Sequence, residues 1–184
     1  MEMKFEWKKQ EKEIYGTNTK PCVIDVPAQK YIIISGGGNP NDEIFSDKVA
    51  TLFSVAYKIK IAHKSLVEKS CEITDYSVYP LGGIWSKTLE KENLVKKELQ
   101  YRIMIRQPDF ITREMFDNAL EVAKSKEGNP YLIDILLKQS AMVSAFKYCT
   151  KERLMMNLYH LRLLINIVLN TAISVLKKSI VKYI

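Results

Sequence analysis

A run of five residues at 36–40, Gly-Gly-Gly-Asn-Pro, divides the first half of the sequence into two segments with different patterns. Glycine leaves the backbone unrestricted and proline cannot donate a backbone hydrogen bond, so such a run ends a regular element. Before it, β-branched residues cluster at 22–26 and 31–35, which predicts strands. After it, apolar residues recur at helical spacing, and we expect a long helix from Asn41 to about His63.

Two more strands and a second helix follow. We expect strands at 76–81 and 99–106, the second because apolar and polar residues alternate along it. The charged segment 87–97 between them is expected to be a solvent loop, and strands joined by a loop pair antiparallel. Thr112 is placed to cap a helix that ends at Gly-Asn-Pro, 128–130. The predicted fold class is α+β, with an antiparallel sheet and a strand-helix-strand-strand unit.

Composition narrows the partners and the compartment. The chain has 184 residues, 47% of them hydrophobic, and a net charge of +7 from lysines spread over its length. Scattered charge without a nucleic-acid-reading motif argues against direct nucleic-acid binding. Cys22, Cys71 and Cys149 are too far apart to suggest a metal site or disulfides. Because the N-terminus lacks the apolar run of a signal peptide, we expect a cytoplasmic protein. We expect no metal or cofactor, since neither His63 nor His160 has a ligand partner at useful spacing.

Four segments together resemble the stand-alone GyrI-like small-molecule-binding proteins. They are KFEWKKQEKE at 4–13, GGGNPN at 36–41, YSVYPLGGIW at 76–85 and YRIMIRQPDFIT at 101–112. The resemblance runs from about Met3 to Asp134. It implies two strand-helix-strand-strand units joined pseudo-symmetrically, with a cleft between them for flat, apolar, often cationic drugs.

Aromatic residues on or beside two neighbouring strands are the candidate ligand contacts. Flat ligands stack on such rings, although rings also fill protein cores. The candidates are Tyr76, Tyr79, Trp85 and Tyr101, with Tyr76 and Trp85 preferred. We therefore expect a small hydrophobic or cationic ligand.

Gly82 argues against catalysis. Some members of the resembled family look like hydrolases of cyclopropane-bearing DNA alkylators and carry a pattern similar to Pro-Leu-Glu-Gly here, so glycine stands where an acid is expected. Other acids nearby in sequence are interpreted as surface residues: Glu72, Asp75 and Glu98. A hydrolase that uses a carboxylate elsewhere, and a regulatory module that binds another protein, are the alternative functions.

The sequence divides into an N-terminal arm at 1–20, mobile or laid on the surface, a ligand-binding domain at 21–135 and a divergent helical tail at 136–184. The family's second unit is missing from the tail, which instead contains an apolar run from Leu154 to Leu176. Polar residues interrupt this run, so we do not expect it to span a membrane. An exposed apolar helix favours self-association, so a homo-oligomer through the tail is an open alternative.

A reading-frame change would explain the tail. Back-translated and read one base out of frame, residues 140–170 can spell DGFCVQILHKGTFDDEPLSF, which is similar to the missing family segment. Because methionine has a single codon, three residues of this peptide are forced: Gly from Met142–Val143, Asp from Met155–Met156 and Glu from Met156–Asn157. We place the slip between about Tyr131 and Ser140, and expect ligand binding to be impaired.

Overall fold

The computed structural model describes residues 3–15, 22–67, 73–87, 98–140, 143–147 and 181–183. Its centre is a five-stranded sheet in which every pair of neighbours is antiparallel. The strands, in order across the sheet, are β7 (Leu136–Ser140), β3 (Gln29–Gly37), β6 (Leu99–Gln107), β5 (Leu81–Lys87) and β9 (Val181–Tyr183). The α+β class and the antiparallel sheet are thus as predicted.

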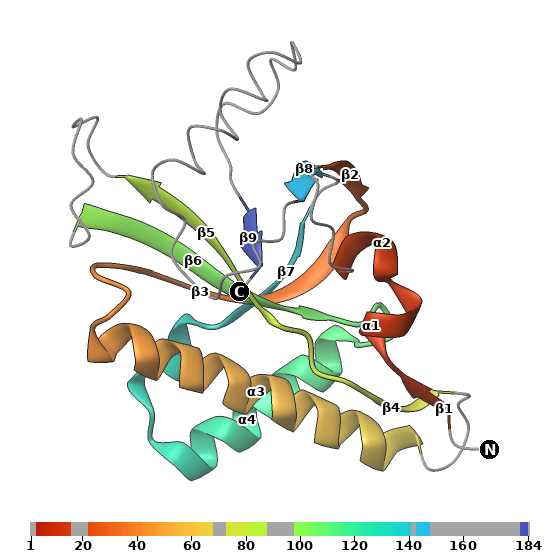
Figure 1. Ribbon diagram of the computed structural model, residues 1–184. Helices are drawn as coiled ribbons and strands as arrows, with labels where there is room; N and C mark the ends of the chain where they lie inside the picture. The colour runs from red at the N-terminus through yellow and green to blue at the C-terminus, as the bar shows by residue number, and fades with distance from the viewer. Residues whose placement is uncertain are drawn as a thin grey trace.

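Helices α3 (Glu43–Val67) and α4 (Arg113–Glu127) lie together on one side of this sheet (Figure 1). Helix α3 begins after the predicted breaker but ends at Val67, four residues beyond the predicted end at His63, whereas α4 begins and ends at the predicted signals. Gly38, at a φ of 118°, precedes α3 in a backbone conformation that favours glycine. The Thr112 hydroxyl accepts a hydrogen bond from the Met115 N–H at the start of α4, and Gly128, in the left-handed region, ends it. Each helix turns its apolar side to the sheet.

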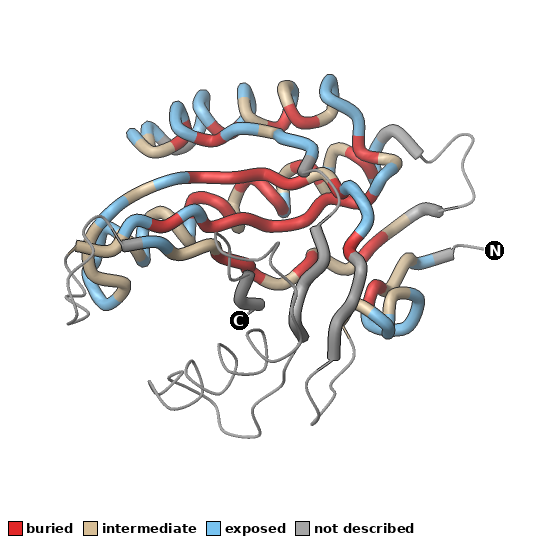
Figure 2. Tube along the Cα trace, turned by 90° about the horizontal axis from the view of Figure 1, so that it is seen from above, coloured by how far each residue is buried: buried red, intermediate tan, exposed pale blue. Residues whose placement is uncertain are grey.

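The two faces of the sheet differ in what they contact. On the face toward the helices, the main core includes Ile32, Ile34, Ile103 and Ile105, all 0% exposed. On the opposite face, a separate cluster contains Tyr31, Ile33 and Met104, with Ile84 packed against it. We call this opposite side the second face. Buried residues follow the central strands and the inner sides of the helices (Figure 2).

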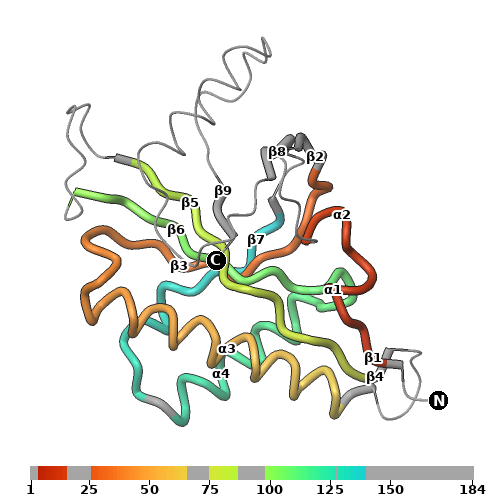
Figure 3. Tube along the Cα trace, viewed as in Figure 1, coloured from red at the N-terminus to blue at the C-terminus, as the bar shows by residue number. Residues whose placement is uncertain are grey.

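The N-terminal residues 3–15 are laid against the fold. Strand β1 (Met3–Phe5) pairs in parallel with β4 (Ile73–Tyr76), and the short helices α1 (Trp7–Gln10) and α2 (Lys12–Tyr15) follow (Figure 3). Trp7 is buried, and its indole N–H donates to the Val78 carbonyl at 3.0 Å. These residues therefore contribute Trp7 to the main core, and Phe5 and Tyr15 pack against it.

The strand predicted at 76–81 is wrong. Strand β4 ends at Tyr76 and β5 begins at Leu81, with residues 77–80 outside either strand. Pro80 cannot donate to a ladder, which explains the interruption. Strand β5 then runs through Gly82 and Gly83 to Lys87 and pairs antiparallel with β6. The predicted antiparallel pairing is therefore confirmed, but the partner of β6 is 81–87 rather than 76–81. Residues 88–97 lie outside the described part.

The predicted helical tail from residue 136 is wrong for three segments, which are strands. Strand β7 joins the sheet beside β3, β8 (Val143–Lys147) pairs with β2 (Cys22–Val26), and β9 pairs with β5. Leu137 packs against the main core, so β7 continues the fold without a boundary at 135. A short 3₁₀ helix at Pro130–Asp134 connects α4 to β7. The apolar run 154–176, and with it the expected self-association, lies outside the described residues.

Among the described residues, no helix has both the length and the apolar character needed to cross a membrane.

Candidate functional site

Arg106 lies on the second face, because side chains alternate along β6 and Arg106 stands directly opposite Tyr31 of β3. The residue is only 5% exposed. Its Nη1 donates to the Glu11 carboxylate, which lies between α1 and α2 and is 95 positions away in sequence. The Tyr79 hydroxyl donates to the same carboxylate oxygen at 3.0 Å. A buried ion pair therefore ties the N-terminal residues to the central sheet.

Three aromatic rings surround this ion pair. The Arg106 guanidinium lies 4.9 Å from the centre of the Tyr79 ring. Trp7 stacks on Tyr79 with ring centres 5.7 Å apart and planes 18° from parallel. Tyr15 contacts both rings, at 5.1 Å from Trp7 and 5.4 Å from Tyr79. We call these residues the Arg106 cluster: Trp7, Glu11, Tyr15, Tyr79 and Arg106.

The electrostatics of the cluster fix its protonation. Burial raises the pKa of the Tyr79 hydroxyl far above its usual value, so the hydroxyl stays neutral and donates. Burial alone would lower the pKa of Arg106, but the hydrogen bond to Glu11 and the electrostatic interactions with Tyr79, Tyr15 and Glu11 together outweigh it, and the pKa is raised. The cluster thus presents a permanent cation and a neutral hydroxyl at any physiological pH.

Gln29 adds a buried amide on the same face. The Tyr31 hydroxyl donates to Gln29 Oε1 at 2.7 Å, and Gln29 is only 1% exposed. The amide nitrogen Nε2 of Gln29 and the Nε of Arg106 are both buried donors, and within the described structure neither has an acceptor in hydrogen-bond distance. Buried donors of this kind are rare in folded proteins and indicate a place where a partner is absent.

Gly82 lies near the Arg106 cluster. It pairs with Met104, two residues before Arg106 on β6, and therefore also lies on the second face. The position where the resembled hydrolases carry an acid is thus on the same face as Glu11. The second face therefore carries Arg106 and an apolar cluster, while the rings beside the ion pair belong to the main core (Trp7 and Tyr79) or pack against it (Tyr15).

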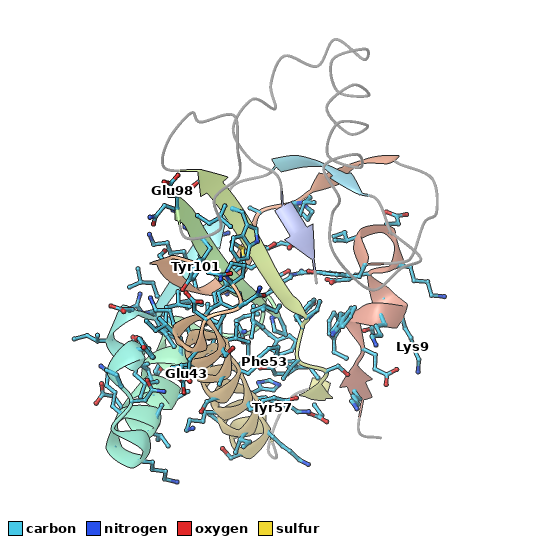
Figure 4. All side chains as sticks on the ribbon, turned by 60° about the vertical axis from the view of Figure 1, so that its left-hand side comes forward. Lys9, Glu43, Phe53, Tyr57, Glu98 and Tyr101 are labelled. Carbon is cyan, nitrogen blue, oxygen red and sulfur yellow. The ribbon has the colours of Figure 1, made fainter. Side chains whose placement is uncertain are left out.

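Two of the predicted ligand contacts lie together elsewhere. Trp85 and Tyr101 are opposite each other on β5 and β6, 5.4 Å apart between ring centres, and Phe45 of α3 contacts both. They share the helix-side face with Ile103, and Figure 4 shows Tyr101 near the start of α3, where Glu43 lies. A Cβ on Gly36 would come within 2.5 Å of the Tyr101 hydroxyl oxygen, so glycine there admits the ring.

Tyr76 is in a third place. It is 1% exposed and contacts the rings of His63 and Phe110 in the main core. Burial, followed by the charge of Asp75, raises the pKa of its hydroxyl well above the usual value. The four predicted residues therefore do not form one shared wall, and Tyr79 alone among them belongs to the Arg106 cluster.

Sequence reasoning did not identify Glu11, Gln29 or Arg106. Both charged residues fall inside segments quoted for the resemblance, and alternation along β6 already placed Arg106 among its polar positions. The available signal for Arg106 was its position beside the apolar Ile105 in a strand predicted to be buried on one face. Among the described residues, no three His, Cys, Asp or Glu side chains gather as metal ligands.

Comparison with known proteins finds relatives by structure. No family model matches the sequence and no curated protein matches it. An uncharacterised conserved protein from Listeria innocua aligns with a TM-score of 0.78 at 24% identity, covering 91% of this chain and 81% of that protein. A hydrolase encoded by lin2189 in Listeria innocua aligns with a TM-score of 0.76 at 25% identity, covering 92% and 82%. Another Listeria innocua hydrolase gives 0.74 at 24% identity, covering 91% and 84%. The chain therefore shares its fold with these three Listeria innocua proteins.

Proposed function

We propose that the chain binds a small, flat, largely apolar organic molecule on the second face of the sheet, beside the Arg106 cluster. The observation that carries this proposal is the group of rings beside the buried Arg106–Glu11 pair, in which Trp7 stacks on Tyr79 and Tyr15 packs at an angle against both. Small-molecule sites combine apolar and aromatic walls with a few placed polar groups, and this arrangement has both.

The apolar part of the proposed site is the second-face cluster. Tyr31, Ile33 and Met104 are 6–8% exposed, and Ile84 packs against them. They lie on adjacent strands, so their side chains form one continuous apolar patch, which we propose as the wall that the flat molecule contacts. Of the four aromatic residues predicted from sequence, we assign ligand contact to Tyr79, while Tyr76, Trp85 and Tyr101 stabilise the helix side.

The test is a titration with flat polycyclic dyes, neutral and cationic, followed by tryptophan fluorescence. Trp7 stacks directly on Tyr79, so a ligand at the cluster changes its emission. We expect Ile84→Lys, which places a charge on the second face, to weaken binding at least about tenfold, because burying an unpaired ammonium is costly. The matched control is Val122→Lys on the exposed side of α4, where Val122 is 44% exposed. Equal affinities of the two variants, or no dye response from the unmodified protein, would contradict the proposal.

Hydrolysis is the second candidate function, and the position of Glu11 favours it. Gly82 provides no acid on the second face, whereas Glu11 brings a carboxylate to it beside the Tyr79 hydroxyl. Two of the structurally similar proteins are described as hydrolases. In this proposal Glu11 orients a water molecule that adds across a strained carbon–carbon bond of a cyclopropane-bearing substrate.

Turnover of such a substrate, followed by chromatography, tests this second function. We expect Glu11→Gln to lower the rate at least about a hundredfold, within the usual range for a lost general base. Asp75→Asn serves as the control. Asp75 forms an ion pair with Lys60, at 3.2 Å between Oδ1 and Nζ, and is not part of the Arg106 cluster. Undiminished turnover by Glu11→Gln would refute the role of Glu11, and no turnover by the unmodified protein would refute hydrolysis.

A further inference from the structure

The two buried donors on the second face both require the same kind of ligand atom, a hydrogen-bond acceptor. An amide N–H and a guanidinium N–H both require an acceptor, and a buried donor without one costs about 1–3 kcal/mol. Gln29 Nε2 and Arg106 Nε are such donors, within residues that are 1% and 5% exposed. A folded protein retains this cost most readily where a ligand supplies the acceptor.

The positions of these donors allow one ligand group to reach both. Arg106 stands directly opposite Tyr31, and Gln29 is two residues from Tyr31 on the same face of β3. Gln29 and Arg106 are therefore diagonal neighbours across two strands, a spacing that long side chains bridge. The Tyr31 hydroxyl holds the Gln29 amide by its oxygen at 2.7 Å, which fixes where the nitrogen lies.

The charges on the second face favour an anionic or strongly polar acceptor. Arg102 lies on the same face of β6, and Lys138 of β7 stands opposite Tyr31; both side chains are exposed. The described carboxylate in contact with Arg106 is that of Glu11, which balances one cation and leaves the other two. Positive potential of this kind attracts a carboxylate and repels an ammonium group.

We infer that Gln29 and Arg106 form a subsite for a carboxylate or carbonyl oxygen, and that the ligand of the second face is a flat molecule bearing such an oxygen. This inference rests on the proposed binding function and differs from the cationic ligand expected from the family resemblance. Arg106 donates through Nε while its Nη1 stays on Glu11, so ligand binding leaves the ion pair intact.

The test compares two compounds with the same rings and opposite charge, anthracene-9-carboxylate and 9-(aminomethyl)anthracene. Dissociation constants come from tryptophan fluorescence, and the Arg106 Nε–H resonance is followed by NMR on ¹⁵N-labelled protein. We expect the carboxylate to bind at least about tenfold more tightly and to shift this resonance, as charge-assisted hydrogen bonds do.

The matched variants are Gln29→Met and Gln107→Met. Gln107 is also 1% exposed but lies on the helix side of β6, so it shares burial and chemistry with Gln29 but not the subsite. We expect Gln29→Met to lower carboxylate affinity about tenfold and Gln107→Met to leave it unchanged. If Gln29→Met does not fold, Gln29→Asn, which withdraws the amide by one carbon, takes its place with the same expected direction.

The results of these experiments distinguish failure of the acceptor subsite from failure of the proposed binding function. Binding of both anthracenes with equal affinity, or an equal effect of the two glutamine variants, overturns the acceptor subsite and leaves the binding function standing. Binding of neither compound contradicts both.

Discussion

Removal of either charge from the Arg106–Glu11 pair should destabilise the fold by more than an ordinary surface ion pair does. The two side chains are 6% and 18% exposed, so each charge left alone is poorly solvated. Breaking a fully buried pair costs about 3–5 kcal/mol, and the partial exposure of Glu11 lowers our expectation to about 2–3 kcal/mol for each single change. The perturbations are Glu11→Gln and Arg106→Met.

The double variant tests whether the two residues act through each other. With both charges gone no isolated ion remains, so we expect a total loss of about 3 kcal/mol and a coupling energy of about 1–3 kcal/mol. Glu11→Gln keeps an acceptor for the Tyr79 hydroxyl, which confines the change to the charge.

The assay is urea unfolding followed by fluorescence, with the free energy of unfolding extrapolated to water. Lys124→Met is the control, because its pair with Glu121 is exposed and an exposed pair contributes at most about 1 kcal/mol. If the losses of the two single variants sum to the loss of the double variant within about 0.5 kcal/mol, the argument is refuted, because the stability losses of independent sites add in this way.

Three other predictions follow from the same structure. Trp7→Ala removes the stacked ring and the indole hydrogen bond to Val78, so we expect a loss of about 3–5 kcal/mol in urea unfolding, and a loss below about 1 kcal/mol would show that the N-terminal residues do not pack as described. Burial alone would raise the pKa of Asp75, but its hydrogen bonds from Lys60 and the Tyr76 N–H outweigh this and lower the pKa; the stability contributed is therefore present at neutral pH and is lost as pH falls through the carboxyl range. The difference in unfolding free energy between the protein and Asp75→Asn, about 1 kcal/mol at pH 7, should vanish in acid, and a constant difference across the titration would contradict this. The nucleotide sequence should contain the shifted-frame peptide after a slip at or beyond codon 138, because Leu137 still packs in the core; a coding sequence that cannot yield the peptide eliminates the frameshift.

Local signals predicted most of the first half of the fold. The β3–α3 boundary, the Thr112 cap and the end of α4 at Gly128 depend on a few adjacent residues, and they were predicted correctly for that reason. The strand predicted at 76–81 was wrong because Pro80 interrupts an apolar stretch whose pattern by itself predicts a strand. Strand β7 was missed because its place beside β3 depends on pairing between distant segments.

The site was harder to predict than the fold. Alternation along β6 indicates that Arg106 and Tyr101 lie on opposite faces, but it does not indicate what each meets. The partner of Arg106 is 95 residues away, between two short helices in a segment that the sequence suggested only as an arm. Aromatic residues that are close in sequence, such as Tyr76 and Tyr79, point to different clusters because the chain leaves the strand between them.

The central claim is that a ligand binds on the second face rather than among the helix-side rings. The most direct measurement is methyl NMR of the ¹³C-labelled protein with saturating anthracene-9-carboxylate. Our account predicts shifts at the methyl groups of Ile33, Ile84 and Met104, with those of Leu52 and Ile59, on the buried side of α3, unchanged. Shifts confined to the helix-side methyl groups would contradict it.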